Sequence, residues 1–149
     1  MRAVVQRVTF SDVTSGQHTV GSICEGLTVF LGVGKGDTEK HARYMAEKIA
    51  GLRIFEDDEG KMNLSVQDVG GAMLAVSQFT LYGDVKKGKR PSFTDAADPE
   101  EAEQLYNVFC ACVRSLGIEV QEGIFQTHML VRIHNDGPVT ILIDSNKEF

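Results

Sequence analysis

Helical spacing of apolar residues occurs in only two stretches of this sequence, and every other apolar run is short and strand-like. The helical stretches are residues 38–50 and 98–116. Two helices placed so unevenly do not suit a doubly wound parallel sheet, in which strands and helices alternate. The sequence therefore predicts a single α+β domain of largely antiparallel, barrel-like β-sheet with two main helices. The expected strands are residues 3–9, 18–23, 27–33, 73–81, 118–121, 128–134 and 138–144.

Start signals precede both helices. Asp37 or Thr38 can cap the first helix. For the second helix we expect Asp98 as the N-cap, Pro99 at the first helical position and Glu101 completing a capping box. These signals make the two helices the best-defined elements of the prediction.

Length and composition narrow the class of protein. The 149 residues fit one domain spanning 1–149, with 42% hydrophobic and 24% charged residues, as in ordinary globular proteins. A formal net charge of −6 argues against sequence-blind binding of nucleic acid by the whole surface. The sequence lacks a signal-peptide pattern and any long apolar run, so we expect a cytoplasmic protein with no membrane partner. Its three cysteines show no framework spacing, which favours reduced, buried thiols.

Positive charge is concentrated in one place. Four cations surround Gly88 within five residues: Lys86, Lys87, Lys89 and Arg90. A solvated loop and a local nucleic-acid contact are equally compatible with this pattern.

Residue spacing gives no support to a metal centre. No His-x-His or Cys-x-x-Cys pair occurs, and His128 and His134 would lie about 20 Å apart on one strand face. The sequence also lacks the Gly-x-Ser-x-Gly pattern of a nucleophilic serine. We expect no metal and no cofactor.

Polar side chains end an otherwise apolar strand at Ser77-Gln78-Phe79-Thr80. Thr80 could act as a nucleophile only with a base beside it, and nothing local supplies one. A strand-end hydroxyl that bonds to the backbone is the simpler interpretation. Polar groups at such a place still need partners or a ligand, so the segment is a candidate binding wall.

A second candidate is Gly137-Pro138, which lies between two strongly predicted strands. An ordinary hairpin turn is one interpretation, since only about 5–6% of X-Pro bonds are cis. A cis bond could instead direct both carbonyls the same way, as a rigid reader built from backbone alone. Such a reader would suit a site that must reject one enantiomer.

These two segments resemble the two signature motifs of the D-aminoacyl-tRNA deacylase family. The first runs from Ser77 to Leu81 and the second, Asn-Asp-Gly-Pro-Val-Thr, from Asn135 to Thr140. The first motif is similar to the branch with Ser-Gln-Phe-Thr rather than to the animal paralogue with a Pro-Gln start. The resemblance covers nearly the whole chain and includes Val5-Gln6-Arg7-Val8, Arg53-Ile54-Phe55, Gly60-Lys61-Met62-Asn63-Leu64 and Arg90-Pro91-Ser92-Phe93.

The resemblance implies an enzyme that hydrolyses the ester between a D-amino acid and the terminal ribose of tRNA. Glycine mischarged on a tRNA for alanine would also be removed, whereas L-aminoacyl-tRNA would be spared. Such enzymes serve chirality proofreading in translation. They are homodimers in which the cis Gly-Pro motif of one subunit enters the active site of the other.

Carried over to this chain, Gly137 and Pro138 would form the chiral filter, and Arg7 and Asn135 would support their motif. Other residues would line the pocket for the terminal adenosine and the aminoacyl group. These are Ser77, Gln78, Phe79, Thr80 and Met129, the last near the Gly-Pro turn.

The implied mechanism needs no triad. The neighbouring ribose 2′-hydroxyl would activate the attack, and backbone N–H groups near Phe79 would stabilise the oxyanion. Thr80 would then position the substrate rather than act as a covalent nucleophile. Separately from the resemblance, the charge pattern makes Lys86, Lys87, Lys89 and Arg90 candidate tRNA-binding residues.

One segment departs from the family pattern. Members usually have Phe-Gly-Ala or Phe-Ala-Ala where this chain has Phe125-Gln126-Thr127, followed by His128 and Met129. The larger polar residues are expected to change the volume of the pocket.

Two other functions stay open from the residues alone: an RNA-binding module without catalysis, and a metal-free hydrolase of small D-amino-acid esters or peptides.

Overall fold

The computed structural model describes residues 1–149, and its centre is the long strand β1 (Arg2–Ser15). Three strands pair with β1 in antiparallel fashion: β2 (His18–Ile23), β3 (Gly26–Gly32) and β8 (Met129–Asp144). Strand β8 pairs with β1 alone, so its other edge is unpaired.

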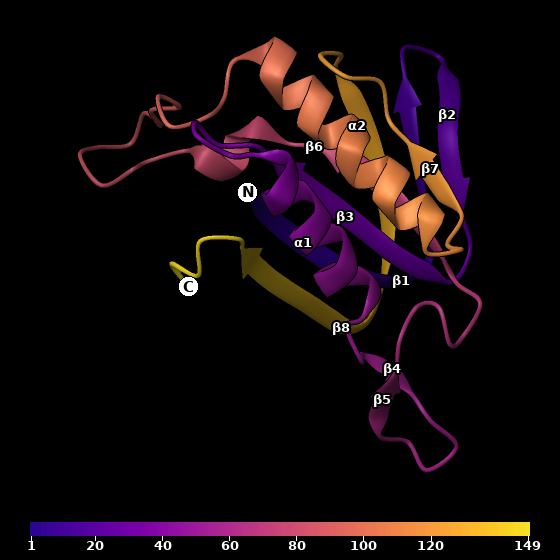
Figure 1. Ribbon diagram of the computed structural model, residues 1–149. Coiled ribbons are helices and arrows are strands. Elements are labelled where there is room, and N and C mark those ends of the chain that lie inside the picture. Colours follow the sequence, from indigo (N-terminus) through magenta and orange to yellow (C-terminus); the bar gives the residue numbers. More distant parts are fainter.

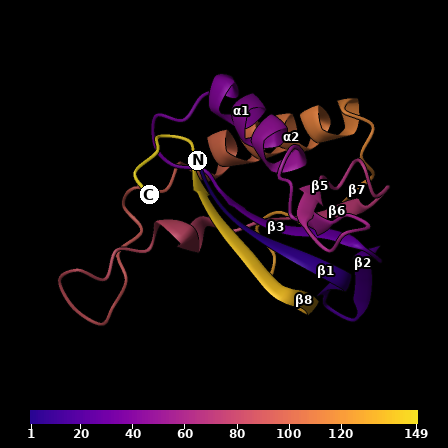
Figure 2. The same cartoon turned by 90° about the horizontal axis from the view of Figure 1, so that it is seen from below.

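Two parallel strands extend the sheet on the side of β3. Strand β6 (Ala72–Ser77) pairs with β3, and β7 (Val120–Glu122) pairs with β6. Helix α1 (Glu39–Ala50) connects β3 to β6, and helix α2 (Pro99–Ser115) lies between β6 and β7. Both helices cover one face of the sheet (Figure 2). The two parallel pairs qualify the expectation of a largely antiparallel sheet, because each helix serves as a crossover between parallel strands.

The sheet curls until β2 approaches β7 (Figure 1). Gly21 on β2 permits this approach, since a Cβ there would lie 2.9 Å from the Glu122 carbonyl oxygen and 3.2 Å from the Leu74 side chain. The predicted α+β class with a barrel-like sheet and two main helices is confirmed.

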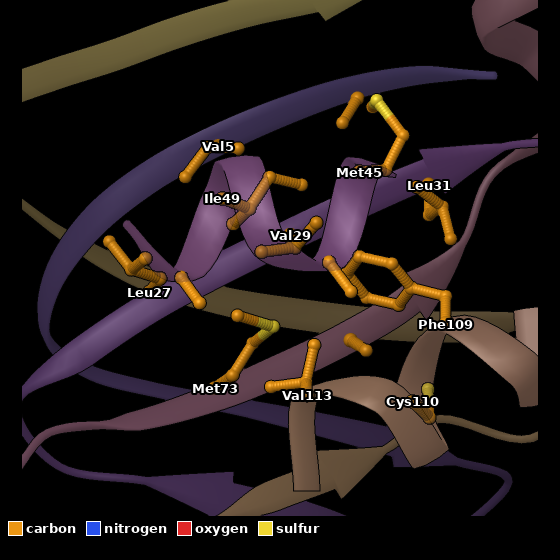
Figure 3. Close-up of a cluster of buried hydrophobic side chains, with 14 of the residues drawn as sticks. Val5, Leu27, Val29, Leu31, Met45, Ile49, Met73, Phe109, Cys110 and Val113 are labelled. Carbon is orange, nitrogen blue, oxygen red and sulfur yellow. The ribbon is translucent and has the colours of Figure 1, made fainter. Parts of the chain in front are cut away.

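The main core lies between the sheet and the two helices (Figure 3). Strands β1 and β3 contribute Val5 and Val29, helix α1 contributes Ile49 and helix α2 contributes Phe109, all completely buried. A smaller cluster, around Val13 and four other buried residues, fills the opposite face of the sheet. Helix spacing and strand alternation in the sequence thus point to the same buried interior.

The expected strand over residues 73–81 ends early. It stops at Ser77, and the chain continues as the short 3₁₀ helix η1 (Phe79–Tyr82). A small hairpin that the sequence did not indicate is formed by β4 (Phe55–Glu56) and β5 (Met62–Leu64). Asp57 closes its turn by accepting backbone hydrogen bonds from Glu59 and Lys61, at 2.9 and 3.0 Å.

The two expected strands at 128–134 and 138–144 are one strand, β8, interrupted by a bulge. Asn135 aligns with Val8 of β1 and Thr140 with Gln6, so five steps along β8 oppose two along β1. The Gly137–Pro138 peptide bond in this bulge is cis. An ordinary hairpin turn is therefore not what the structure has at this position.

Two smaller expectations differ from the structure. Thr38 caps α1, with His41 accepting its backbone N–H, but the Asp98 side chain makes no capping hydrogen bond, so no capping box forms with Glu101. Cys24 is exposed, whereas Cys110 is buried as expected. No helix is both long and apolar enough to cross a membrane.

Candidate active site

A cavity of about 760 Å³ opens where β6 ends and α2 begins. One wall is the end of β6 and the start of η1, with Ser77, Gln78 and Phe79. The opposite wall is the segment Phe125–Met129, which leads into β8. Three of the four residues of the predicted binding wall therefore line one cavity with Met129.

The wall is polar because the chain changes from buried apolar residues to polar ones where β6 ends. The four residues from Met73 to Val76 are buried in the sheet, and the chain leaves the sheet after Ser77. Ser77 and Gln78 are partly buried, and Phe79 is 56% exposed. The end of β6 and the start of η1 thus place polar side chains and one exposed aromatic ring at the cavity.

Two glycines, one at the end of β3 and one in the loop after it, leave room for η1 to pack against the sheet. A Cβ on Gly32 would lie 2.9 Å from the Gln78 carbonyl oxygen, and one on Gly34 would lie 2.6 Å from the Tyr82 ring. The cluster Gly32-Val33-Gly34-Lys35-Gly36 begins the connection from β3 to α1. Its further role, which the sequence did not reveal, is to let η1 approach the sheet.

Thr80 lies beside the cavity wall but has no base next to it. It is exposed, and its hydroxyl oxygen accepts a hydrogen bond from the Gln78 side chain, its only side-chain partner. Without a basic group in contact, the hydroxyl is not activated as a nucleophile. The arrangement holds Gln78 and Thr80 together at the start of η1.

Backbone donors are free at the same place. The first N–H groups of a helix have no partner within it, and neither Phe79 nor Thr80 donates a backbone hydrogen bond elsewhere. Gln78 is fixed by its own N–H, which donates to the Leu31 carbonyl at 2.9 Å. Two unpaired N–H groups therefore lie next to a rigid strand end.

The opposite wall is a turn with its own hydrogen bonds. Thr127 donates to the Ile124 carbonyl at 2.9 Å and contacts the Ser15 hydroxyl at 3.1 Å. Gln126 has a φ of 58°, a left-handed conformation that is uncommon outside glycine. The Met129 sulfur lies 2.6 Å from where a Cβ on Gly123 would be, so that glycine makes room for Met129.

The rim of the cavity joins the basic loop. Phe93 packs edge-on against Phe79, with ring centroids 5.1 Å apart, and both line the cavity. Hydrogen bonds between Asp84 and Ser92 close the loop that carries the four cations, the long excursion at the left of Figure 1. All four cations are exposed, and none forms an ion pair within the chain.

The sequence did not indicate that Ala97, Asp98 and Pro99 contribute to this rim, since nothing in their residue types signals a site.

The bulge with Gly137 and Pro138 has supports of its own. Arg7, only 6% exposed, donates to the Ile54 carbonyl at 2.7 Å, and its Nε lies 3.1 Å from Asp136 Oδ2 in an ion pair. Asn135 Nδ2 donates to the Thr140 hydroxyl across the base of the bulge at 3.4 Å. Arg7 and Asn135 thus both contact residues of the bulge that flank the Gly-Pro motif.

Within one chain, the cavity and the bulge are apart. Gly137 lies eight positions after Met129 on β8, a separation of at most about 26 Å at a rise of roughly 3.3 Å per residue. Gly137 and Pro138 are exposed and do not line the cavity. Met129 therefore lies near the first motif rather than near the Gly-Pro motif of its own chain.

Known sequences match this chain over its whole length. The family model described as D-Tyr-tRNA(Tyr) deacylase matches residues 4–144. A D-aminoacyl-tRNA deacylase of Koribacter versatilis is 62% identical over 149 residues, with all of both chains covered. One from Symbiobacterium thermophilum is 61% identical, covering 100% of this chain and 99% of that one.

Solved structures share the architecture. The c-Myc DNA Unwinding Element Binding Protein is 43% identical with a TM-score of 0.91, over 97% of this chain and 98% of that one. A probable eukaryotic D-amino acid tRNA deacylase has a TM-score of 0.80 at 19% identity, covering 95% and 97% of the two chains. At that identity the second likeness shows the fold alone.

Proposed function

The chain belongs to the D-Tyr-tRNA(Tyr) deacylase family and is a hydrolase, and from this premise we propose that it cleaves D-aminoacyl-tRNA while sparing the L-enantiomer. The products are the free D-amino acid and the tRNA. The proposal rests on the cavity at the end of β6, where the Ser77–Phe79 wall lies beside backbone N–H groups that have no partner. Because translation uses the charged tRNA, the proposed location is the cytoplasm.

In the proposed reaction, water attacks the carbonyl carbon of the ester with help from the neighbouring ribose 2′-hydroxyl. The N–H groups of Phe79 and Thr80 stabilise the oxyanion, a contribution of several kcal/mol in enzymes that use such donors. Thr80 positions the substrate, in keeping with the absence of a base beside its hydroxyl. The C–O bond to the 3′ oxygen then breaks, and that oxygen leaves with a proton.

The chiral filter is proposed to come from a second copy of the chain. The bulge at Gly137–Pro138 is exposed and about eight strand residues away from the cavity wall of its own chain. In a homodimer the same bulge can reach the partner's cavity and exclude an L side chain. The unpaired edge of β8, together with exposed Leu130 and Leu142 on this strand, supports burial of this region against another copy.

A filter of this kind has a second consequence for substrate range. It rejects L-aminoacyl groups by occupying the space of their side chain, and glycine has no side chain to reject. Glycine mischarged on a tRNA for alanine is therefore a proposed substrate as well. The chain's Met129 and Phe125 would bound the space that remains for a D side chain.

Contacts to the tRNA backbone are proposed for the basic loop, Lys86–Arg90. The loop leads directly to Phe93 on the cavity rim, and its cations have no acidic partner within the chain. Phosphate contacts from this loop would hold the acceptor end over the cavity.

The test is release of free D-tyrosine from D-Tyr-tRNA, with L-Tyr-tRNA and a small D-tyrosine ester assayed in parallel. We expect release from D-Tyr-tRNA only. Binding of tRNA without release would instead favour an RNA-binding module, and equal cleavage of the small ester would favour a simple D-ester hydrolase. Either result would overturn the proposed function.

A further inference from the structure

Arg2, a residue outside the cavity, contacts the 3₁₀ helix η1. Arg2 Nη1 donates to the Leu81 carbonyl at 3.3 Å, and the guanidinium lies over the Tyr82 ring with 4.6 Å from Cζ to the centroid. Its Nε donates to Asp144 at 3.1 Å. One cation thus contacts the last residues of η1 and the end of β8 at the same time.

Tyr82 forms the second support. Its ring covers Gly34, and its hydroxyl donates to Asp37 Oδ2 at 3.4 Å. Asp37 is itself fixed by the Gly34 N–H at 2.7 Å and by the α-amino group of Met1 at 2.6 Å. Burial and the nearby Asp37 carboxylate raise the pKa of Tyr82, so its hydroxyl keeps the proton that it donates.

We propose that Arg2 and Tyr82 are positioning residues for deacylation, which hold η1 so that the N–H groups of Phe79 and Thr80 face the ester. The proposal deepens the proposed function and rests on it. Neither residue lines the cavity, and both line a separate, smaller pocket, so we expect neither to touch the substrate. Only four residues form η1, so its geometry depends on contacts with its surroundings more than on its own hydrogen bonds.

The structure allows this role to be separated from general stabilisation. Arg2 also pairs with Glu148 at 2.9 Å, a residue whose side chain is 60% exposed and makes no hydrogen bond to η1. Glu148→Gln therefore removes one ion pair of Arg2 while leaving its bond to Leu81. It is the matched control for Arg2→Gln.

We expect Arg2→Gln and Tyr82→Leu to lower kcat for D-Tyr-tRNA about tenfold with KM within about twofold, since misplacing a catalytic group by 1 Å can cost up to about 10²-fold. Tyr82→Phe keeps the ring beneath Arg2 and should retain most of the activity. Arg2→Lys keeps the charge but not the planar contact, and we expect partial rescue. Glu148→Gln should behave as the wild type.

Hydrogen exchange provides a readout that does not depend on activity. The Gly83 N–H donates to the Thr80 carbonyl at 3.0 Å and reports whether η1 is formed. In Arg2→Gln, exchange at Gly83 should accelerate while amides paired between β1 and β3 keep their protection. Unchanged kcat, or loss of protection throughout the sheet, would overturn the proposal. If the wild type released no D-tyrosine, the proposed function would fail, while exchange at Gly83 would still test the anchoring.

Discussion

Gly137 is the residue at which the bulge leaves least room for change. Its φ is 115°, and a Cβ there would lie 2.8 Å from Val139 Cγ2 and 3.1 Å from Arg7 Nη2. A side chain at this position would meet both unfavourable backbone geometry and crowding. The bulge therefore depends on the absence of a side chain at a single residue.

We expect Gly137→Ala to abolish most D-Tyr-tRNA deacylation, because the added methyl group displaces the bulge or the Arg7 side chain. Gly16→Ala is the matched control: its φ is 63°, but nothing lies within 4 Å of the added Cβ. Both variants should unfold at slightly lower temperature, and only the first should lose activity. Full activity in Gly137→Ala, measured by release of D-tyrosine, would contradict the role of the bulge.

Thr80 provides a second test at the scale of one residue. Its hydroxyl contacts Gln78 and no base, so we expect Thr80→Ala to retain much of the wild-type kcat. Single-turnover kinetics with D-Tyr-tRNA would measure this. Trapping of an aminoacyl group on Thr80 by acid quench would refute the proposed water attack.

Among the elements, β6 and β8 show what sequence patterns can reveal. The apolar run of β6 and the polar residues after it predicted a strand end that carries a site, and in the structure a cavity opens at this strand end. Periodicity could not show that residues after Ser77 turn into η1, because four residues are too few to display a helical repeat. It also could not show that the runs on both sides of the bulge pair with the same strand, β1.

Strand direction was harder to predict than strand position. The parallel pairing of β3 with β6 depends on α1 crossing over the sheet, and this is a property of packing rather than of local sequence. The Ser77–Phe79 wall and the supports of the Gly-Pro motif could be predicted because their residues are close in sequence or match the family motifs. The packing of η1 against Gly32 and Gly34 could not be predicted, since it brings together segments that are far apart in the chain.

The basic loop gives a prediction at the scale of one element. Lys86→Gln combined with Lys87→Gln should weaken tRNA binding and reduce the slope of log K against log salt by roughly one per lost phosphate contact. Lys40→Gln with Lys48→Gln, on α1, is a control with the same change in net charge. An identical slope in loop variant and wild type, measured by titration with uncharged tRNA, would exclude a contact from this loop.

For the whole molecule, the distance between cavity and bulge makes a mixing experiment possible. In the proposed homodimer each active site takes its cavity from one chain and its bulge from the other. A variant with Gln78→Ala and Phe79→Ala damages the cavity, and Gly137→Ala damages the bulge. Each should be nearly inactive alone.

After the two variants are mixed and their subunits exchanged, half of the sites in a mixed dimer should be intact, and activity should return. Mixing without exchange is the control. Activity that stays at the level of the separate variants, in a mixture shown by native mass spectrometry to contain mixed dimers, would argue that both motifs serve the same chain.

In the proposed homodimer, the separation of cavity and bulge along β8 also has a genetic consequence. A cell that makes wild-type chains together with chains damaged in only one of the two parts would keep one working site in every mixed dimer. Chains damaged in both parts would leave none, because each site would receive one defective part. Such a double mutant allele would be dominant negative, whereas either single mutation would be largely recessive.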